Sequence, residues 1–334
     1  MLPEESERLE APSLCMSVDR QIFCLKSLIF FMGLLEELQS EIERRALPGG
    51  GWASESGRSN AGIETTCYAL MTLRDDRGPA RQKAIDLFVR TRNQDGSWPA
   101  FEGDDPEGCW TTALAVMALR FAQPSVVPFD QAFRWLVNIR GREGDWFWNW
   151  KFRTVDRGVR FNPSKYGWPW FPGTVSWVVP TAFSLITLQQ AFSCCRAEHV
   201  ANRVRLGTEM LLDRACPGGG WNAGNGMVFG AALNAHIDTT AIALLALVID
   251  NAEPAVHQAL NWLRLTSAEC SSPYSLAWSA LAFLMHKDRA AKLCIARLQE
   301  AMSSDLSIFN TETLSLAAIA INPTGSTTNP FKVI

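Results

Sequence analysis

Positive charge, histidine and paired cysteines are all scarce in this chain, and each scarcity excludes a class of protein. The 334 residues carry 31 lysines and arginines against 34 aspartates and glutamates, so the chain offers no basic footprint for nucleic acid. Nine cysteines occur without a Cys-x-x-Cys motif, and there are only four histidines. We therefore expect a cytoplasmic protein with reduced, packed thiols, no bound metal and no cofactor.

The chain also lacks an apolar run long enough to cross a bilayer. The first apolar run, residues 22–35, contains Lys26, and an acidic segment precedes it, which is unlike a signal peptide. We expect residues 1–40 to form an N-terminal helical segment that supplies an outer helix. The alternative is a peripheral membrane contact in which these side chains face the lipid: Phe23, Ile29, Phe30, Phe31 and Leu34.

Tryptophan, in contrast, is abundant, with 13 residues against three tyrosines. Four of the tryptophans end a glycine-rich turn: Trp52, Trp98, Trp146 and Trp221. Each turn is followed by a helix that opens with threonine, usually as a pair. We use the second threonine of each opening, or the lone one, as a marker: Thr66, Thr112, Thr181 and Thr240. Self-similarity of this kind predicts a repeat architecture.

Each repeat contains two helices with different apolar patterns. The segments 84–88, 132–136 and 259–263 carry apolar residues at i, i+1, i+3 and i+4, which predicts amphipathic outer helices. The segment 241–248 follows a marker and is apolar on every side, which predicts a buried inner helix. One repeat is therefore an outer helix, a Gly-Trp turn and an inner helix.

Two weaker copies of the inner helix, at residues 275–281 and 311–316, bring the number of helical hairpins to about six. Hairpins wound with one hand close into a ring, which removes the exposed ends that an open solenoid must cap. We predict an all-α fold, an α/α toroid over residues 41–322, with a C-terminal tail at 323–334. An open superhelix is the structural alternative.

An aromatic insert, residues 145–173, enlarges the interval between Thr112 and Thr181. Disordered loops are rarely this aromatic, so the insert either plugs one mouth of the toroid or walls a cavity for an apolar ligand. A basic run beside it either binds an anionic group or forms a solvated face. That run contains Lys151, Arg153, Arg157 and Arg160.

The repeat resembles that of the prenyltransferase and squalene-cyclase superfamily. Residues 94–98, Gln-Asp-Gly-Ser-Trp, are similar to the Gln-x-x-x-Gly-x-Trp element of squalene–hopene and oxidosqualene cyclases in a shortened form. Gly-Gly-Gly-Trp followed by helices that open with Asp or Glu and two threonines is the general pattern of the superfamily. The resemblance covers residues 40–320 and implies the toroid fold.

The resemblance to class II terpene cyclases also implies a catalytic acid. These enzymes protonate an alkene or epoxide with the middle aspartate of Asp-x-Asp-Asp-Thr-Ala, and residues 236–241 fall on that frame. Asp238 matches the donor, whereas His236 and Thr239 replace the flanking aspartates and would tune it. A carboxyl must be buried and protonated to act as an acid. The alternative is that Asp238 only caps its helix.

A carbocation needs a dry pocket with π-faces at short range, and the aromatic residues of the chain suit this role. We predict that the substrate contacts Trp110, Trp148, Trp150, Trp168, Trp170, Trp177, Phe171 and Phe183. A second candidate acid pair, Asp104 and Asp105, lies in a Gly/Pro-rich loop, where a solvated turn is the alternative. The predicted activity is acid-initiated cyclisation or isomerisation of an isoprenoid.

Two other functions suit the same fold. One is a non-catalytic isoprenoid-binding or scaffold protein. The other is a zinc-dependent prenyltransferase-like subunit, although the chain lacks the Asp-x-Cys of that site and offers only Cys67, His236 and Asp238. The expected partner is an apolar isoprenoid rather than nucleic acid, and we leave open a peripheral membrane contact and a second subunit or homodimer.

Overall fold

The structure is a computed structural model that describes residues 32–333 except 56, 74–77, 124, 126–127, 157, 159, 193–196 and 323–328. The first described helix covers residues 32–44. The later α-helices are α2 (Ile63–Thr72), α3 (Pro79–Thr91), α4 (Thr111–Ala122), α5 (Asp130–Asn138), α6 (Trp146–Thr154), α7 (Val178–Phe192), α8 (Glu198–Asp213), α9 (Ile237–Ala246), α10 (Pro254–Glu269), α11 (Pro273–Met285), α12 (Ala291–Met302) and α13 (Thr311–Ile321). The connections contain the 3₁₀ helices η1 (Arg142–Gly144) and η2 (Leu306–Ile308) and an antiparallel pair of strands, β1 (Met227–Val228) and β2 (Ala231–Ala232).

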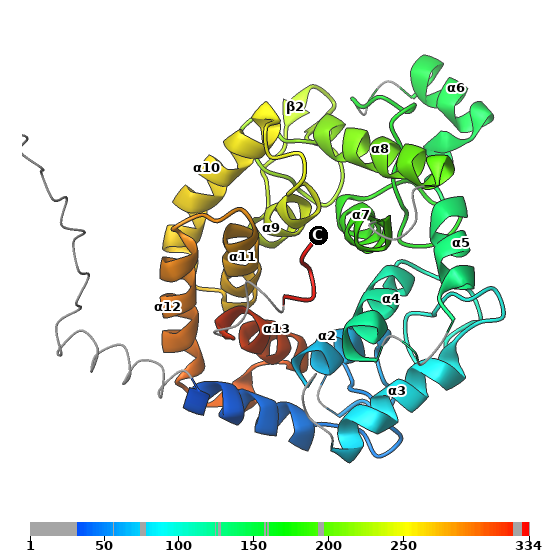
Figure 1. The fold of residues 1–334 in the computed structure, drawn as a ribbon. Helices are drawn as coiled ribbons and strands as arrows, with labels where there is room; N and C mark the ends of the chain where they lie inside the picture. Colours follow the sequence, from blue (N-terminus) through cyan, green and yellow to red (C-terminus); the bar gives the residue numbers. More distant parts are fainter. Residues whose placement is uncertain are drawn as a thin grey trace, which may run out of the picture.

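The helices form a closed double ring, which confirms the predicted all-α toroid. The inner helices pack on one another in the order α2, α4, α7, α9, α11, α13, and α13 packs back against α2. Figure 1 shows the helix of residues 32–44 and α3, α5, α8, α10 and α12 around the outside. The contact between α13 and α2 excludes the open superhelix, because that form would leave these two faces unpaired.

The apolar patterns explain which helix lies inside. In α9 every residue from Thr239 to Ala246 is buried, because neighbouring inner helices, an outer helix and the centre of the ring surround it. In α5 only Ala132 and Leu136 are fully buried, so the helix buries one stripe and exposes the rest. Burying one leucine side chain contributes about 1.5–3 kcal/mol, so both patterns strongly favour the observed placement.

The Gly-Trp turn joins the two helices of a repeat through the tryptophan. In four repeats the indole N–H donates a hydrogen bond of 2.6–2.8 Å to a carbonyl near the end of the outer helix. The backbone N–H of the same tryptophan donates to the hydroxyl of the marker threonine at 2.9–3.1 Å. These tryptophans are Trp52, Trp98, Trp168 and Trp221. The repeat is thus a packing device, and its threonines are not free for chemistry.

Glycine is required immediately before two of these tryptophans. Gly51 has φ +77° and Gly220 has φ +76°, a backbone region that L side chains rarely adopt. A Cβ at Gly51 would lie 2.8 Å from the hydroxyl oxygen of Thr66, and one at Gly220 would lie 2.6 Å from that of Thr240. A side chain at either position would therefore displace the threonine that binds the turn.

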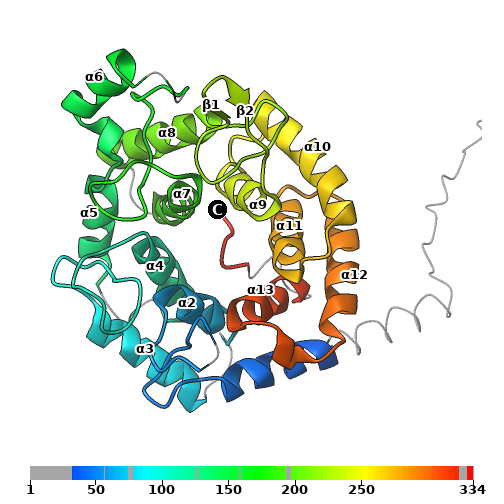
Figure 2. The ribbon, with the colours of Figure 1, turned by 180° about the vertical axis from the view of Figure 1, so that it is seen from behind.

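One predicted turn is wrong. Trp146 does not occupy the repeat position, because its side chain is 82% exposed at the start of α6. Trp168 occupies it instead, with its indole N–H on the Leu136 carbonyl and its backbone N–H on the Thr181 hydroxyl. The guanidinium of Arg203 covers the Trp168 ring at 3.4 Å from its centroid. The first part of the aromatic insert therefore lies outside the repeat, and Figures 1 and 2 both place α6 beyond the outer helices.

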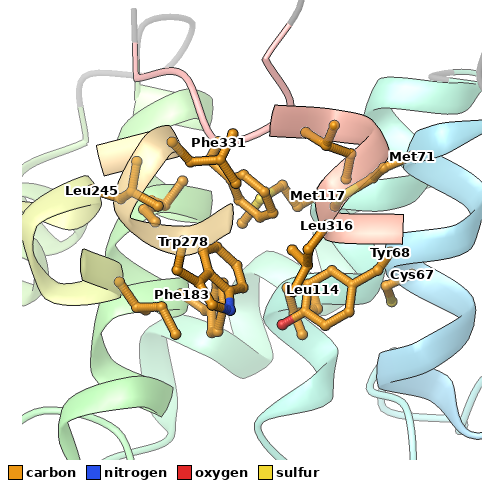
Figure 3. Close-up of a cluster of buried hydrophobic side chains, with 14 of the residues drawn as sticks. Cys67, Tyr68, Met71, Leu114, Met117, Phe183, Leu245, Trp278, Leu316 and Phe331 are labelled. Carbon is orange, nitrogen blue, oxygen red and sulfur yellow. The ribbon is translucent and has the colours of Figure 1, made fainter. Parts of the chain in front are cut away.

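The end of the chain enters the centre of the ring, which the sequence did not indicate. Phe331 is fully buried, with ring centroids 5.1 Å from Trp278 and 6.3 Å from Phe183. Figure 3 shows it among side chains of the inner helices, including Leu245 and Leu316. The part of the interior around Phe331 is therefore packed solidly rather than open.

The first described helix packs against the ring as an outer helix. Leu34, which the membrane alternative placed toward lipid, is buried in the core, together with Leu38 and Ile42. The other apolar side chains of that alternative, Phe23 and residues 29–31, lie outside the described residues. Within the described ranges, none of the helices combines the length and apolarity that crossing a bilayer requires.

Candidate functional site

One repeat position recurs around the mouth of the toroid at which the inner helices begin. In α11 and α13, Leu276 and Leu314 correspond to the marker threonines, since their backbone N–H groups donate to Ser272 and Asn310 as that of Thr240 donates to His236. The residue two positions before each marker lies in or next to the first turn of an inner helix. Around the ring these residues are Glu64, Trp110, Val179, Asp238, Tyr274 and Glu312. We call these six residues the mouth ring.

Two of the three mouth-ring carboxyls are neighbours at the seam between α2 and α13. Thr65, which is fully buried, donates a 2.6 Å hydrogen bond from its hydroxyl to Oε1 of Glu312. Burial, followed by the charge of Glu312, raises the pKa of Glu64 to about 8. Burial likewise raises the pKa of Glu312. Two carboxyls this close favour holding at least one proton at neutral pH.

Hydroxyl and indole groups surround this pair. Tyr68 donates from its hydroxyl to Oε1 of Glu64 at 3.4 Å. The Tyr68 ring meets Trp278 edge-on with centroids 5.8 Å apart, and Tyr274 meets Trp278 at 6.3 Å. Burial and the nearby charge of Glu64 raise the pKa of both tyrosines, so they are neutral hydrogen-bond donors at physiological pH.

Three aromatic side chains, Trp110, Trp170 and Phe183, form an aromatic wall that reaches the carboxyl pair through Trp278. Trp110 packs edge-on against Trp170 with centroids 4.9 Å apart and lies 5.8 Å from Phe183. Phe183 in turn lies 5.8 Å from Trp278. Three of the predicted substrate-contacting residues, Trp110, Trp170 and Phe183, are thus brought together next to the mouth ring. Their π-faces could stabilise a cation formed there.

The aspartate predicted from the sequence frame lies in the same ring. Asp238 is half-buried in the first turn of α9, and its charge acts on Tyr274. No hydrogen bond or ion pair to its carboxylate occurs in the part of the chain that the structure describes, and the helix has no side-chain cap. Thr239 is buried, whereas His236 is exposed and binds the Trp221 carbonyl only through its backbone N–H.

The remaining predicted substrate residues lie apart from the mouth ring. Trp168 is enclosed by its own repeat, and Trp177 is half-buried next to Gly224. Trp148 lies on α6 between Arg142 and Lys151, whose charged groups are 4.8 and 4.7 Å from its ring centroid. Trp150 is 53% exposed and Phe171 is 46% exposed. The structure thus separates the predicted aromatic residues into a mouth group (Trp110, Trp170 and Phe183) and a rim group (Trp148, Trp150 and Phe171). Trp168 and Trp177 belong to neither group.

Several polar side chains beside the aromatic insert and in the Asp104–Asp105 loop interact with residues close to them in the sequence. Lys151 pairs with Asp156 at 3.6 Å, and Arg153 binds the hydroxyl of Ser164. Asp104 accepts hydrogen bonds from backbone N–H groups of its own turn, as expected for a solvated loop. Arg157 lies outside the described residues, while Arg160 and Asp105 are exposed.

The structure does not assemble the zinc site that the sequence left conceivable. Among the described residues, no three His, Cys, Asp or Glu side chains approach as metal ligands. Cys67 is fully buried on α2, whereas His236 is exposed at the start of α9. These two inner helices are not neighbours in the ring.

A separate apolar hollow of about 420 Å³ lies on the outside of the ring. It lies between α5 and α8, and Phe133, Val137 and Val200 line it with Leu188 of α7. No mouth-ring residue contributes to it. Polar side chains, among them Arg120, Asp130 and His199, line the rest of the hollow.

Comparison with known proteins supports the fold and a likeness to terpene cyclases. No protein-family model matches the chain. A segment of 110 residues is 29% identical to drimenyl diphosphate synthase of Streptomyces showdoensis, which corresponds to 32% of this chain and 21% of that protein. The match therefore spans about a fifth of the curated relative.

Solved structures share the toroid at low sequence identity. A variant of the type II terpene cyclase MstE from Scytonema, in complex with its substrate geranylgeranyl dihydroxybenzoate, superposes with a TM-score of 0.51 at 16% identity. That comparison covers 83% of this chain and 78% of the cyclase. A novel alpha-amylase from Clostridium perfringens has a TM-score of 0.57 at 10% identity, covering 85% and 96%. At these identities the structural neighbours establish the α/α toroid and not the activity.

Sequence reasoning missed Glu64, Tyr68, Tyr274, Trp278 and Glu312. A signal was available for the first of these, because Glu64 precedes two threonines just as Asp238 does. Both residues occupy the same position in their repeats, so the prediction of Asp238 as an acid could have been extended to Glu64. Glu312 and Tyr274 lie in the two weaker copies, which lack the marker threonine and hide the alignment.

Proposed function

We propose that this chain is a terpene-cyclase-like enzyme that catalyses acid-initiated cyclisation or isomerisation of an isoprenoid at the mouth ring. The observation that carries the proposal is the juxtaposition of two partly buried carboxyls with raised pKa, Glu64 and Glu312, and an aromatic wall that includes Trp110 and Phe183. The similarity to a drimenyl diphosphate synthase supports the same reaction class.

The chemistry needs few groups. A neutral carboxyl protonates an alkene, and aromatic faces stabilise the cation that results. Loss of a proton elsewhere ends the reaction, so substrate and product are isomers. The resemblance assigns the acid to Asp238, with His236 and Thr239 as its neighbours, and all three lie at or beside the mouth ring.

The substrate we propose is an apolar isoprenoid. The mouth group of aromatic residues would contact its reacting end. The rim group, which includes Trp148, Trp150 and Phe171, would contact only parts of a ligand that extend beyond the ring. A long, fully polar ligand would fit this site poorly, because the wall beside the Glu64 and Glu312 carboxyls is apolar.

Mass spectrometry of hydrophobic molecules that co-purify with the protein tests the substrate class. Incubation with farnesyl diphosphate, geranylgeranyl diphosphate or squalene, followed by gas chromatography of the extracted products, tests the reaction. We expect an isomer of one of these compounds. Binding of an isoprenoid without conversion would instead favour the non-catalytic binding protein, and hydrolysis of starch would favour an activity like that of the alpha-amylase that shares the fold.

We also propose that the exposed face of α6 contacts a membrane that holds such apolar substrates. Trp146, Phe147 and Trp150 are exposed on this helix, and Lys151 and Arg153 follow in the same segment. Aromatic side chains next to cations suit the interface of an anionic bilayer. A second copy of the chain is the other occupant that the test must exclude.

A further inference from the structure

We propose that Glu64, paired with Glu312, carries the proton that starts the reaction, rather than Asp238. This assignment rests on the proposed function, which it makes specific. It depends on the closure of the toroid, because the two glutamates belong to the first and last inner helices and meet only where α13 packs on α2.

The hydrogen bonds at the seam distinguish the two carboxyls. Glu312 is held by the buried hydroxyl of Thr65 at 2.6 Å, a short distance typical of a bond to a charged carboxylate. Among the residues that the structure describes, Glu64 receives only the longer 3.4 Å bond from Tyr68. The geometry favours a charged Glu312 and a neutral Glu64, since strong donors stabilise the ionised form.

The charges around the pair favour retention of the proton. The titratable groups that act on or respond to Glu64 are Glu312 on α13, Tyr68 and Cys67 on α2, Tyr274 on α11 and Cys109 before α4. Asp238 on α9 adds a further negative charge near Tyr274. Neither glutamate forms an ion pair with a lysine or arginine in the described part of the chain. Burial and Glu312 therefore raise the pKa of Glu64 to about 8 without a cation to oppose them.

An unpartnered donor indicates that a ligand completes this site. The indole N–H of Trp278 forms no hydrogen bond of good geometry among the described residues, although the side chain is fully buried and interacts with the nearby Tyr274 hydroxyl. Figure 3 shows its nitrogen pointing toward the hydroxyl of Tyr68, which binds Glu64. A buried donor without an acceptor is costly, so its acceptor is expected in an oxygen atom carried by the isoprenoid that binds next to the carboxyl pair.

The proposed step is balanced. The O–H bond of Glu64 breaks while the π electrons of the alkene form a new C–H bond, which leaves a carboxylate and a tertiary carbocation. Trp278 and Phe183 present their rings beside that cation. After rearrangement, a C–H bond next to the final cation breaks, its electrons form the product alkene, and a proton returns to the pair. No oxidant, reductant or co-reactant is consumed.

Glu64→Gln tests the donor, with Asp238→Asn as the competing variant and Glu253→Gln, on an exposed residue, as the control. With an isoprenoid that the wild-type protein converts, we expect Glu64→Gln to lower turnover by about 100-fold or more. We expect Asp238→Asn to lower it by less than about tenfold, a loss well short of that expected for removing a general acid. Circular dichroism of each variant shows whether the fold is retained.

Infrared spectroscopy supplies a readout that does not need activity. At pH 6.5, chosen between the ordinary value of 4.5 and about 8, the wild-type protein should show a protonated carboxyl band that Glu64→Gln removes and Asp238→Asn retains. Loss of the band only in Asp238→Asn, or full turnover by Glu64→Gln, would overturn the assignment while leaving the proposed function intact. If the wild-type protein converts none of the isoprenoids, the proposed function fails and the donor role fails with it, whereas the band still shows whether the pair is protonated.

Discussion

Thr65 on α2 donates a 2.6 Å hydrogen bond to the carboxylate of Glu312 on α13, across the seam where the first and last inner helices meet. The two residues are far apart in sequence, and the bond exists only because the toroid closes. The same seam places Glu64 beside Glu312. The candidate acid pair therefore forms only when the ring closes.

The seam bond should be measurable as stability. Thr65→Val keeps the shape of the side chain but removes the donor, which leaves an oxygen of the partly buried Glu312 carboxylate unsatisfied. We expect the free energy of unfolding to fall by about 1–3 kcal/mol. Thr65→Ser, which retains the hydroxyl, should lose less, and denaturant unfolding of the two variants makes the comparison. Equal stability of Thr65→Val and the wild-type protein would show that the bond contributes nothing.

Stability should depend on pH through Glu64. In the unfolded chain this carboxyl ionises near 4.5, whereas in the folded protein it keeps its proton up to about pH 8. Unfolding therefore releases a proton between these values, so the free energy of unfolding declines as pH rises from about 4.5 to 8 and levels off above. Glu64→Gln should remove this part of the decline. Thermal unfolding of the wild-type protein and Glu64→Gln across this pH range measures the difference. Parallel curves of stability against pH for the two proteins would contradict the raised pKa of Glu64.

The repeat tryptophans should be structural. Trp221→Phe removes the indole N–H that binds the Leu211 carbonyl at 2.7 Å and leaves a smaller ring in a fully buried site. We expect a loss of about 1–3 kcal/mol in the free energy of unfolding. Trp150→Phe, at an exposed position, should change it by less than about 0.5 kcal/mol. Chemical denaturation of the two variants makes the comparison, and equal stability of Trp221→Phe and Trp150→Phe would show that the Trp221 indole does not hold the repeat together.

The C-terminal segment should hold the centre of the ring together. Phe331→Ala removes a fully buried ring that contacts Trp278 and Phe183, so we expect destabilisation of about 3–5 kcal/mol. Phe229→Ala is the matched control, because Phe229 is 85% exposed. If the melting temperature of Phe331→Ala equalled that of the control, the packing of the centre would not depend on this residue.

Membrane contact through α6 should depend on its aromatic face and on lipid charge. Sedimentation with vesicles of phosphatidylcholine and phosphatidylserine should capture the wild-type protein more than vesicles of phosphatidylcholine alone. Replacing Trp146 and Trp150 by serine should lower the bound fraction severalfold, whereas Ile308→Ser, at another exposed apolar position, should not. Unchanged vesicle binding, or a loss of dimer instead of a loss of binding, would show that the surface serves another partner.

The sequence predicted the site only where a single repeat carries the signal. Asp238 was found because residues 236–241 resemble a known frame, and it lies in the mouth ring. Glu64 and Glu312 were not predicted as a pair, because the last repeat lacks the marker threonine and so hides that Glu312 occupies the same repeat position as Glu64. Trp146 was taken for Trp168 because both end a turn that contains a glycine, Gly144 and Gly167 respectively, and only packing distinguishes them.

The sequence by itself determined the helices, their inner or outer place and the toroid, because apolar periodicity and the Gly-Trp turns act within one repeat and recur. Only the tertiary structure decided which side chains share a site. Contacts across the seam, the partial burial of Glu64 and the entry of Phe331 into the centre join residues from opposite ends of the chain. Patterns within one repeat do not show which residues from distant repeats lie side by side. The protonation state of a carboxyl depends on those neighbours, which only closure of the ring brings together.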